Sequence, residues 1–177
     1  MAIVNIKGTI VTNADGGTPP QALNQARAAA ARVKESADTV EVTNGDSIDS
    51  VYRLGRVHSS WRISQVIKFS DAITTAVADF GLHDIAANAG AVVDRDFFGS
   101  AVALTAADVA GTDVTHESGA AAGATQFGEV ANIAKAIWQV LGLTADPNKF
   151  YDLTAMLTAA ATGSGTLSVL IRYSDGN

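Results

Sequence analysis

Residues 38–69 read DTVEVTNGDSIDSVYRLGRVHSSWRISQVIKF. Over this stretch the apolar residues recur at every second position, the period of a β-strand with one buried face. The polar clusters at 44–46 (Asn-Gly-Asp) and 58–60 (His-Ser-Ser) are typical of turns between antiparallel strands. In the third segment one face is expected to carry Trp61, Ile63, Ile67 and Phe69, and the opposite face Arg62, Ser64 and Lys68. Three successive strands are therefore predicted.

The same period continues toward the C-terminus. Further strands are predicted at about 73–82, 97–104, 150–157 and 166–173, separated by turn-forming residues. The last segment is expected to be a central strand, because one of its faces is wholly apolar: Leu167, Val169, Ile171 and Tyr173. Many short strands with regular turns, and no repeat of 20 to 50 residues, predict a mainly β protein, an antiparallel β-sandwich of jelly-roll or Ig-like type. The strand order stays open.

Two helices are expected beside the strands. Thr18-Pro19-Pro20 is a typical helix start, and apolar residues at spacings of three and four extend that helix to about Glu35. A second, internal helix is predicted from about 129 to 141, ending at Gly142. Its apolar face is expected to carry Val130, Ile133, Ala134, Ile137 and Leu141.

Before the first helix, residues 2–11 alternate loosely between apolar and polar and are followed by a turn cluster at 13–17. We interpret residues 1–36 as an extended N-terminal arm with a short helix, and residues 37–177 as the sandwich domain. The arm and its thin helix are expected to dock onto a neighbouring subunit, and the arm could add a strand to the neighbour's sheet. The expected interface residues are Ile3, Ile6, Ile10, Leu23 and Val33.

Composition narrows the classes of function. The 18 acidic and 12 basic residues give a net charge of -6, which disfavours nucleic-acid binding. The absence of cysteine excludes disulfides, thiolate metal sites and a cysteine nucleophile. Neither a bilayer-spanning apolar run nor a signal-peptide pattern occurs, so we expect a soluble, unexported protein without a membrane partner.

No catalytic motif stands out. The three histidines, His58, His83 and His116, are isolated in sequence, and no nucleophile-elbow or phosphate-binding pattern occurs. The acidic residues Asp79, Asp84, Asp94 and Asp96 are interpreted as solvated, with calcium binding at a subunit junction and a small hydrolase using Asp94 and Asp96 as alternatives. A carbohydrate-binding module is a further alternative, and it requires Trp61, Tyr52 or Tyr151 in an exposed coplanar row. We expect a non-enzymatic protein without cofactor, catalytic residues or metal site.

Four groups of residues carry a resemblance to a known family: SADTVEV (36–42), GDSI (45–48) leading into SVYRL (50–54), WRIS (61–64) with FSDAIT (69–74), and WQVLGL (138–143) before Asp146-Pro147. They resemble segments of the small structural proteins of tailed bacteriophages that decorate or cement capsids. The resemblance covers roughly residues 36–177 and transfers no site residues.

The resemblance implies a virion protein on the outer capsid surface, made in the host cytoplasm. Its partners would be the major capsid protein and copies of itself, often as a homotrimer. A neck, tail or head-fibre protein is the structural alternative, and the sequence does not separate the two locations.

Overall fold

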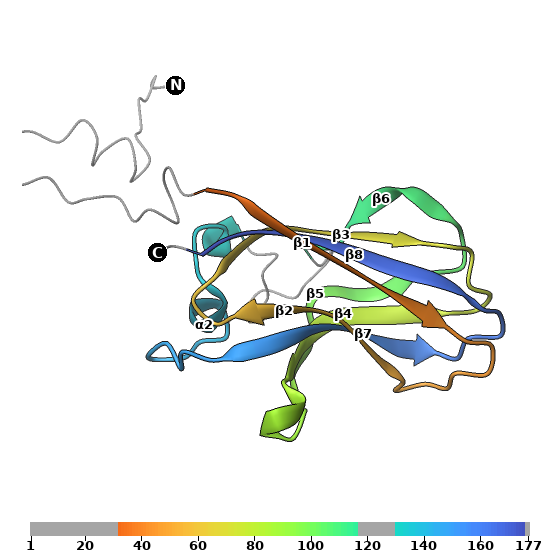
Figure 1. Ribbon diagram of the computed structural model, residues 1–177, viewed down its shortest axis with the longest axis horizontal. Coiled ribbons are helices and arrows are strands. Elements are labelled where there is room, and N and C mark those ends of the chain that lie inside the picture. The colour runs from red at the N-terminus through yellow and green to blue at the C-terminus, as the bar shows by residue number, and fades with distance from the viewer. Residues whose placement is uncertain (1–31, 117–129, 176–177) are drawn as a thin grey trace, which may run out of the picture.

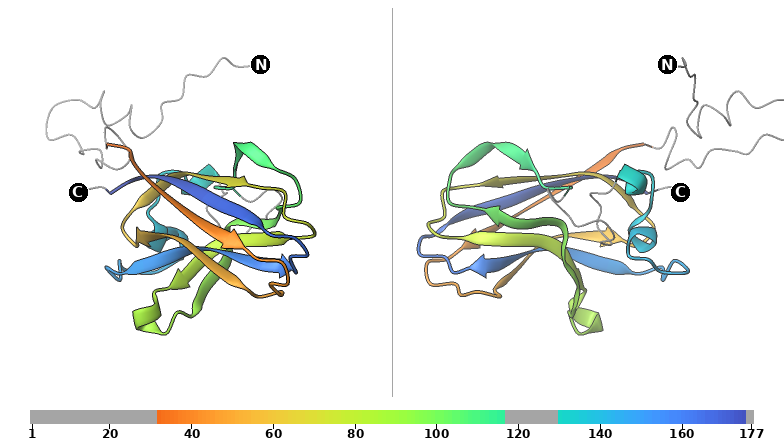
Figure 2. Two further views of the ribbon diagram at one scale, coloured as in Figure 1. Left: turned by 45° about the vertical axis from the view of Figure 1, so that its right-hand side comes forward. Right: turned by 180° about the vertical axis from the view of Figure 1, so that it is seen from behind.

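Two antiparallel four-stranded sheets face each other in the computed structural model, which describes residues 32–116 and 130–175 (Figure 1). The first sheet has the order β1 (Lys34–Val42), β8 (Gly165–Ser174), β3 (Arg62–Ser70) and β6 (Asp108–Asp113). The second has the order β2 (Val51–His58), β7 (Phe150–Ala159), β4 (Val77–Asp84) and β5 (Val92–Ala103). Figure 2 shows the two layers in a view turned by 45° and from behind. The predicted β-sandwich is confirmed.

The strand order distinguishes between the two expected sandwich types. Successive strands from β1 to β4 alternate between the sheets, and the orders 1-8-3-6 and 2-7-4-5 are those of an eight-stranded jelly roll. An Ig domain instead divides seven or nine strands differently. β8 lies between β1 and β3, so its predicted central position is confirmed.

The core lies between the sheets and is formed by alternate residues of the central strands. On β7 these are Tyr151, Leu153, Ala155 and Leu157, and on β8 they are Leu167, Val169 and Ile171, all at most 2% exposed. Phe80, Phe97 and Phe98 fill the space between them. Burial of each large side chain stabilises the fold by about 1.5–3 kcal/mol.

The expected faces of β3 are wrong beyond its third residue. Ile63 pairs with Tyr173 and Gln65 with Arg172, so Ser64 is an extra residue in a β-bulge. Such an insertion moves every following side chain to the opposite face. Val66 and Lys68 therefore point toward the core, and Ile67 and Phe69 lie on the outer face, where Gly111 of β6 packs against them.

Because its side chain points toward the core, Lys68 forms a buried ion pair with Asp108. Its side chain is 4% exposed, and its Nζ lies 3.0 Å from Oδ2 of Asp108, whose side chain is 16% exposed. That oxygen accepts no well-formed hydrogen bond among the described residues, so the contact is chiefly electrostatic. The other oxygen of Asp108 accepts the Gly111 N–H at 3.0 Å. The Thr112 side chain and the positive charge of Lys68 hold the pKa of Asp108 below its ordinary value, against the effect of burial.

The predicted internal helix at 129–141 is also wrong. This segment has a 3-10 turn, η2 (Val130–Asn132), and a single α-helical turn, α2 (Ile137–Val140). The N–H groups of Ile137 and Trp138 donate to the carbonyls of Trp61 and Ser59, so the backbone is bonded to the start of β3 instead of to a preceding helical turn. Ile133, expected on the apolar face, is 60% exposed.

Other boundaries differ from the expectations. β4 begins at Val77, because residues 73–76 form a turn, and β5 is one strand that includes Val92 and the acidic residues after it. β1 begins at Lys34, where the first helix was expected to continue to Glu35. β6 was not predicted, and the short 3-10 turn η1 (Ala86–Asn88) lies between β4 and β5. Residues 1–31 of the expected N-terminal arm and helix lie outside the described residues.

Candidate functional site

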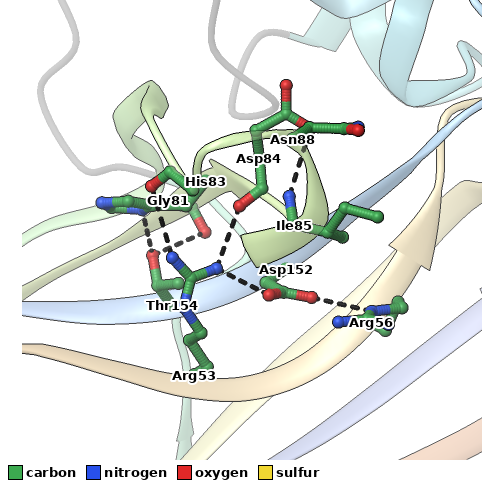
Figure 3. Close-up of polar contacts among 10 residues, drawn as sticks. Arg53, Arg56, Gly81, His83, Asp84, Ile85, Asn88, Asp152 and Thr154 are labelled. Carbon is green, nitrogen blue, oxygen red and sulfur yellow. Dashed lines mark hydrogen bonds and ion pairs between the residues drawn. The ribbon is translucent and has the colours of Figure 1, made fainter.

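A group of ionic and polar side chains lies on the outer face of the second sheet (Figure 3). It consists of Arg53 and Arg56 of β2, Asp152 and Thr154 of β7, and His83 of β4, and we call it the outer polar cluster. Because side chains alternate along a strand, the inward positions of Tyr151, Leu153 and Ala155 place Asp152 and Thr154 outside. The cluster covers the middle of the sheet, so its central members are buried although they face away from the core.

Asp152 is the ionic centre of the cluster. Its Oδ2 accepts a hydrogen bond from Nη1 of Arg53 at 2.6 Å, and its Oδ1 accepts one from Nε of Arg56 at 2.8 Å. The carboxylate is 5% exposed, whereas the two arginine side chains are 36% and 57% exposed. With Asp38 and Gly55, these residues line an open depression of about 320 Å³ at the seam between β1 and β2. The buried negative charge is thus neutralised by cations that remain in contact with water.

Arg53 also fixes the connection between β4 and β5. Its guanidinium donates to the carbonyls of Asp84 at 3.0 Å and Gly90 at 3.3 Å. Lys149 binds the Asp84 carboxylate at 2.7 Å, and this bond is the main reason that the pKa of Asp84 lies below its usual range. The cluster therefore joins β2, β7, β4 and the loop after β4.

His83 is the only histidine in the cluster, and it is 3% exposed. Its Nδ1 is 2.8 Å from Oγ1 of Thr154, which is fully buried. Burial, and then the positive charge of Arg53, lower the pKa of His83, so the ring is neutral at pH 7. A neutral imidazole beside a hydroxyl resembles a base and a nucleophile, but both groups are covered, and the arrangement serves to satisfy buried polar atoms. Apart from the alternation of apolar and polar residues in β7, no sequence pattern indicated this pair.

Gly81, next to these residues, allows a bulge of β5 to lie over the sheet. A Cβ on Gly81 would be 2.1 Å from the carbonyl oxygen of Arg95 and 2.3 Å from that of Asp94. The register changes from Phe80–Gly99 to Leu82–Asp94, so β5 contains extra residues opposite Gly81. Only glycine leaves enough space for this approach.

The acidic residues considered from the sequence do not converge. Asp79 binds Nε of Arg95 at 2.6 Å and accepts the Ala101 N–H, whereas Asp84 binds Lys149. Across residues 32–116 and 130–175, no group of three or more His, Cys, Asp or Glu side chains has the arrangement of a metal site. The alternatives of a calcium site and of a hydrolase based on Asp94 and Asp96 gain no support from these contacts.

The row of aromatic side chains required for a carbohydrate platform does not form. Tyr151 is 2% exposed and belongs to the core. Tyr52 is half-buried and donates its hydroxyl to Asp46 at 2.6 Å. Trp61 stacks on Tyr173 with ring centroids 4.0 Å apart and an angle of 9° between the planes. These three aromatic residues thus have packing roles and do not form the row that the carbohydrate-binding alternative requires.

Of the expected interface residues, Val33 is the one that the structure describes. It precedes β1 and is 61% exposed, outside any helix. Ile3, Ile6, Ile10 and Leu23 lie outside the described residues. In the described ranges, no helix has the length and hydropathy required to cross a bilayer.

The fold defines an eight-stranded jelly roll, a class found in viral capsid and lectin domains. No protein-family model and no curated protein matches the chain. A chain of the solved structure "Capsid of Ralstonia phage GP4" aligns with a TM-score of 0.58 and 12% identity, over 82% of this chain and 86% of that chain. A chain of "Cyanophage Pam1 capsid asymmetric unit" aligns with a TM-score of 0.47 and 13% identity, over 89% and 91%. The first alignment shows a shared fold, and the second is too weak to add to it.

Proposed function

We propose that this chain is a non-enzymatic structural subunit of a bacteriophage virion, and that it decorates or cements the capsid lattice. The observation that carries the proposal is the jelly roll shared, over most of both chains, with a chain of a Ralstonia phage capsid structure. In this role the partners are the major capsid protein and other copies of the chain, with a trimer as the expected oligomer, and the position is the outer surface of the capsid.

Four of the nine exposed large apolar side chains among the described residues lie at one end of the sandwich, which makes this end a candidate for attachment. The start of β1, η2, α2 and the start of β7 lie at this end (Figure 1). The exposed apolar residues in or next to these segments are Val33, Ile133, Leu143 and Phe150, which are 41–61% exposed, and we call this surface the apolar end. Phe150 continues into the half-buried aromatic group of His58, Trp61 and Tyr173. Exposed apolar surface of this kind is typical of protein contacts.

The test is co-sedimentation of the full chain with empty phage-type shells, together with the oligomeric mass from light scattering. Specific binding of a defined oligomer supports the proposal. A full chain that binds no shell and stays monomeric would refute it, whereas rings or fibres without shell binding would favour the neck, tail or head-fibre alternative.

Two matched variants locate the contact. Ile133→Ser changes the apolar end, and Ile48→Ser changes a residue of similar exposure, 54% against 60%, in the β1–β2 connection at the opposite end. Burial of an isoleucine contributes about 1.5–3 kcal/mol, so Ile133→Ser should weaken binding roughly 10- to 100-fold. Ile48→Ser should leave binding unchanged, and equal effects of the two variants would refute the assignment of this end.

A further inference from the structure

β1 differs from the three other edge strands of the sandwich. It pairs with β8 over nine residues in unbroken register. β2 and β6 each have a register shift, and β5 has three. Bulges and short length are common means of preventing an edge strand from pairing with another chain. Within the described residues, β1 has neither, and it is exposed along most of its length.

The hydrogen-bonding direction of β1 follows from its partner strand. The N–H of Asp71 donates to the carbonyl of Thr166, and the N–H of Thr166 donates to the Asp71 carboxylate, both at 2.9 Å. The backbone of Thr166 thus faces β3, so Glu41, which is opposite Thr166 on β1, also points away from β8. Because this direction repeats every second residue, the backbone groups of Glu35, Ala37 and Thr39 point outward as well.

The contact of Thr39 confirms this direction independently. Its N–H donates to Oδ1 of Asp38 at 2.8 Å instead of to β8. The Asp38 carboxylate therefore covers the middle of this edge, close to Arg53 and Arg56 of β2. Glu35, Ala37 and Glu41 have no outward backbone hydrogen bond among the described residues.

Charge and sequence indicate which strand this edge fits. β1 contains Glu35, Asp38 and Glu41 against one cation, Lys34, so pairing of two β1 strands would bring like charges together. Residues 2–11, AIVNIKGTIV, contain one charged residue, Lys7, and alternate in the manner of a strand. A strand that carries a cation and no acid complements an acidic edge.

Chain length permits a donor from another copy and excludes a tight hairpin within one chain. The 22 residues 12–33 separate this segment from β1, and connections within a β-hairpin usually have two to five residues. A chain of this length extends at most about 80 Å, which is enough to reach an adjacent subunit.

We propose that the outer edge of β1 accepts residues 2–11 of a second copy of this chain as an added strand. The added strand forms main-chain hydrogen bonds with Glu35, Ala37 and Glu41, and the Asp38 carboxylate turns away from the edge when it binds. This inference goes beyond the proposed virion role, because it requires only self-association.

Disulfide trapping tests the exchange, since the chain has no cysteine of its own. Donor chains carry Asn5→Cys or Ile6→Cys, which lie on opposite faces of a strand, and acceptor chains carry Thr39→Cys. A control acceptor carries Val109→Cys on β6, the opposite edge of the same sheet, where Val109 is 87% exposed. Mixed under oxidising conditions, one donor should form a mixed disulfide with Thr39→Cys and not with the control. Equal trapping by both acceptors, no trapping, or trapping only when both cysteines are in one chain would overturn the proposal.

A proline variant tests the hydrogen bonds. Ala37→Pro removes an outward N–H without breaking the pairing with β8, and Ala37→Thr is the matched control that keeps the N–H. In light scattering, Ala37→Pro should weaken self-association about tenfold or more, and Ala37→Thr should not. Unchanged association of a folded Ala37→Pro protein contradicts the inference. Shell binding is measured on the same samples, so failure here with shell binding intact would leave the virion proposal standing.

Discussion

Replacement of Asp108 by asparagine should destabilise the fold far more than a surface substitution. Lys68 Nζ and Asp108 Oδ2 are 3.0 Å apart, and at an effective dielectric constant of about 20 their attraction is about 5 kcal/mol. Asp108→Asn leaves the ammonium group, 4% exposed, with Ser70 Oγ at 3.5 Å as its remaining partner among the described residues. Removal of one member of a buried pair costs about 3–5 kcal/mol.

Removal of Lys68 and removal of Asp108 should lower the free energy of unfolding by different amounts. In Lys68→Met, Asp108 keeps the Gly111 N–H and stays partly exposed to water, so we expect a loss of about 1–3 kcal/mol. The double variant Lys68→Met/Asp108→Asn leaves no buried charge and should recover most of the loss caused by Asp108→Asn alone.

Denaturant unfolding followed by circular dichroism measures these free energies. Lys34→Met is the control, because Lys34 is 51% exposed and pairs with Asp175 at the surface, where an ion pair contributes less than about 1 kcal/mol. In thermal unfolding, Asp108→Asn should lower Tm by roughly 6–20 °C. A loss for Asp108→Asn no larger than for Lys34→Met, or a double variant as unstable as the sum of the singles, would refute this reasoning.

The remaining predictions concern the outer face of the second sheet. His83 has a lowered pKa in the folded protein and an ordinary value of 6.5 when unfolded, so unfolded chains bind more protons below that pH. The free energy of unfolding should fall as the pH decreases from about 7 to about 5, and this slope should weaken in His83→Asn. An unchanged slope in His83→Asn would contradict the assigned cause. Gly81→Ala should cost at least about 2 kcal/mol in denaturant unfolding, because the Arg95 backbone would have to move. Gly142→Ala, whose Cβ meets no atom within 4 Å, should cost only about 1 kcal/mol because of its φ of +70°. Equal losses of stability in the two variants would show that the β5 bulge moves away from residue 81 at little cost, and would contradict the prediction.

The period of two predicted the sandwich because it reports burial on one face, and this signal is strong in β2, β7 and β8. The prediction from this period failed within β3. The extra residue Ser64 moves the following side chains to the opposite faces, and the sequence pattern does not reveal that Ser64 is an insertion. The prediction also missed β6, whose sequence DVAGTD has two acidic ends and a central glycine and is held by pairing with β3. Both the bulge in β3 and the existence of β6 depend on hydrogen bonds between neighbouring strands, and a local sequence pattern carries no information about these bonds.

The expected helix at 129–141 failed for a related reason. Spacings of three and four fit the apolar residues, but two backbone N–H groups of the segment bond to the residues before β3. Tertiary contacts outweighed a helix preference of a few tenths of a kcal/mol per residue. The outer polar cluster could not be predicted from the sequence either. Its members Arg53, His83 and Asp152 are distant in sequence and come together only because β2, β7 and β4 are neighbours in the sheet.

The pairing of β1 with β8 has a consequence for biosynthesis. Lys34 pairs with Tyr173 and Val42 with Gly165, so the first described strand has no partner in its sheet until residues 165–174 have left the ribosome. Contacts this distant in sequence slow folding, because the loop-closure entropy is lost before the contacts form. Closure of the first sheet should therefore wait for the synthesis of β8, and nascent chains that stop before β8 should expose both edges of β1 and require chaperones to stay soluble.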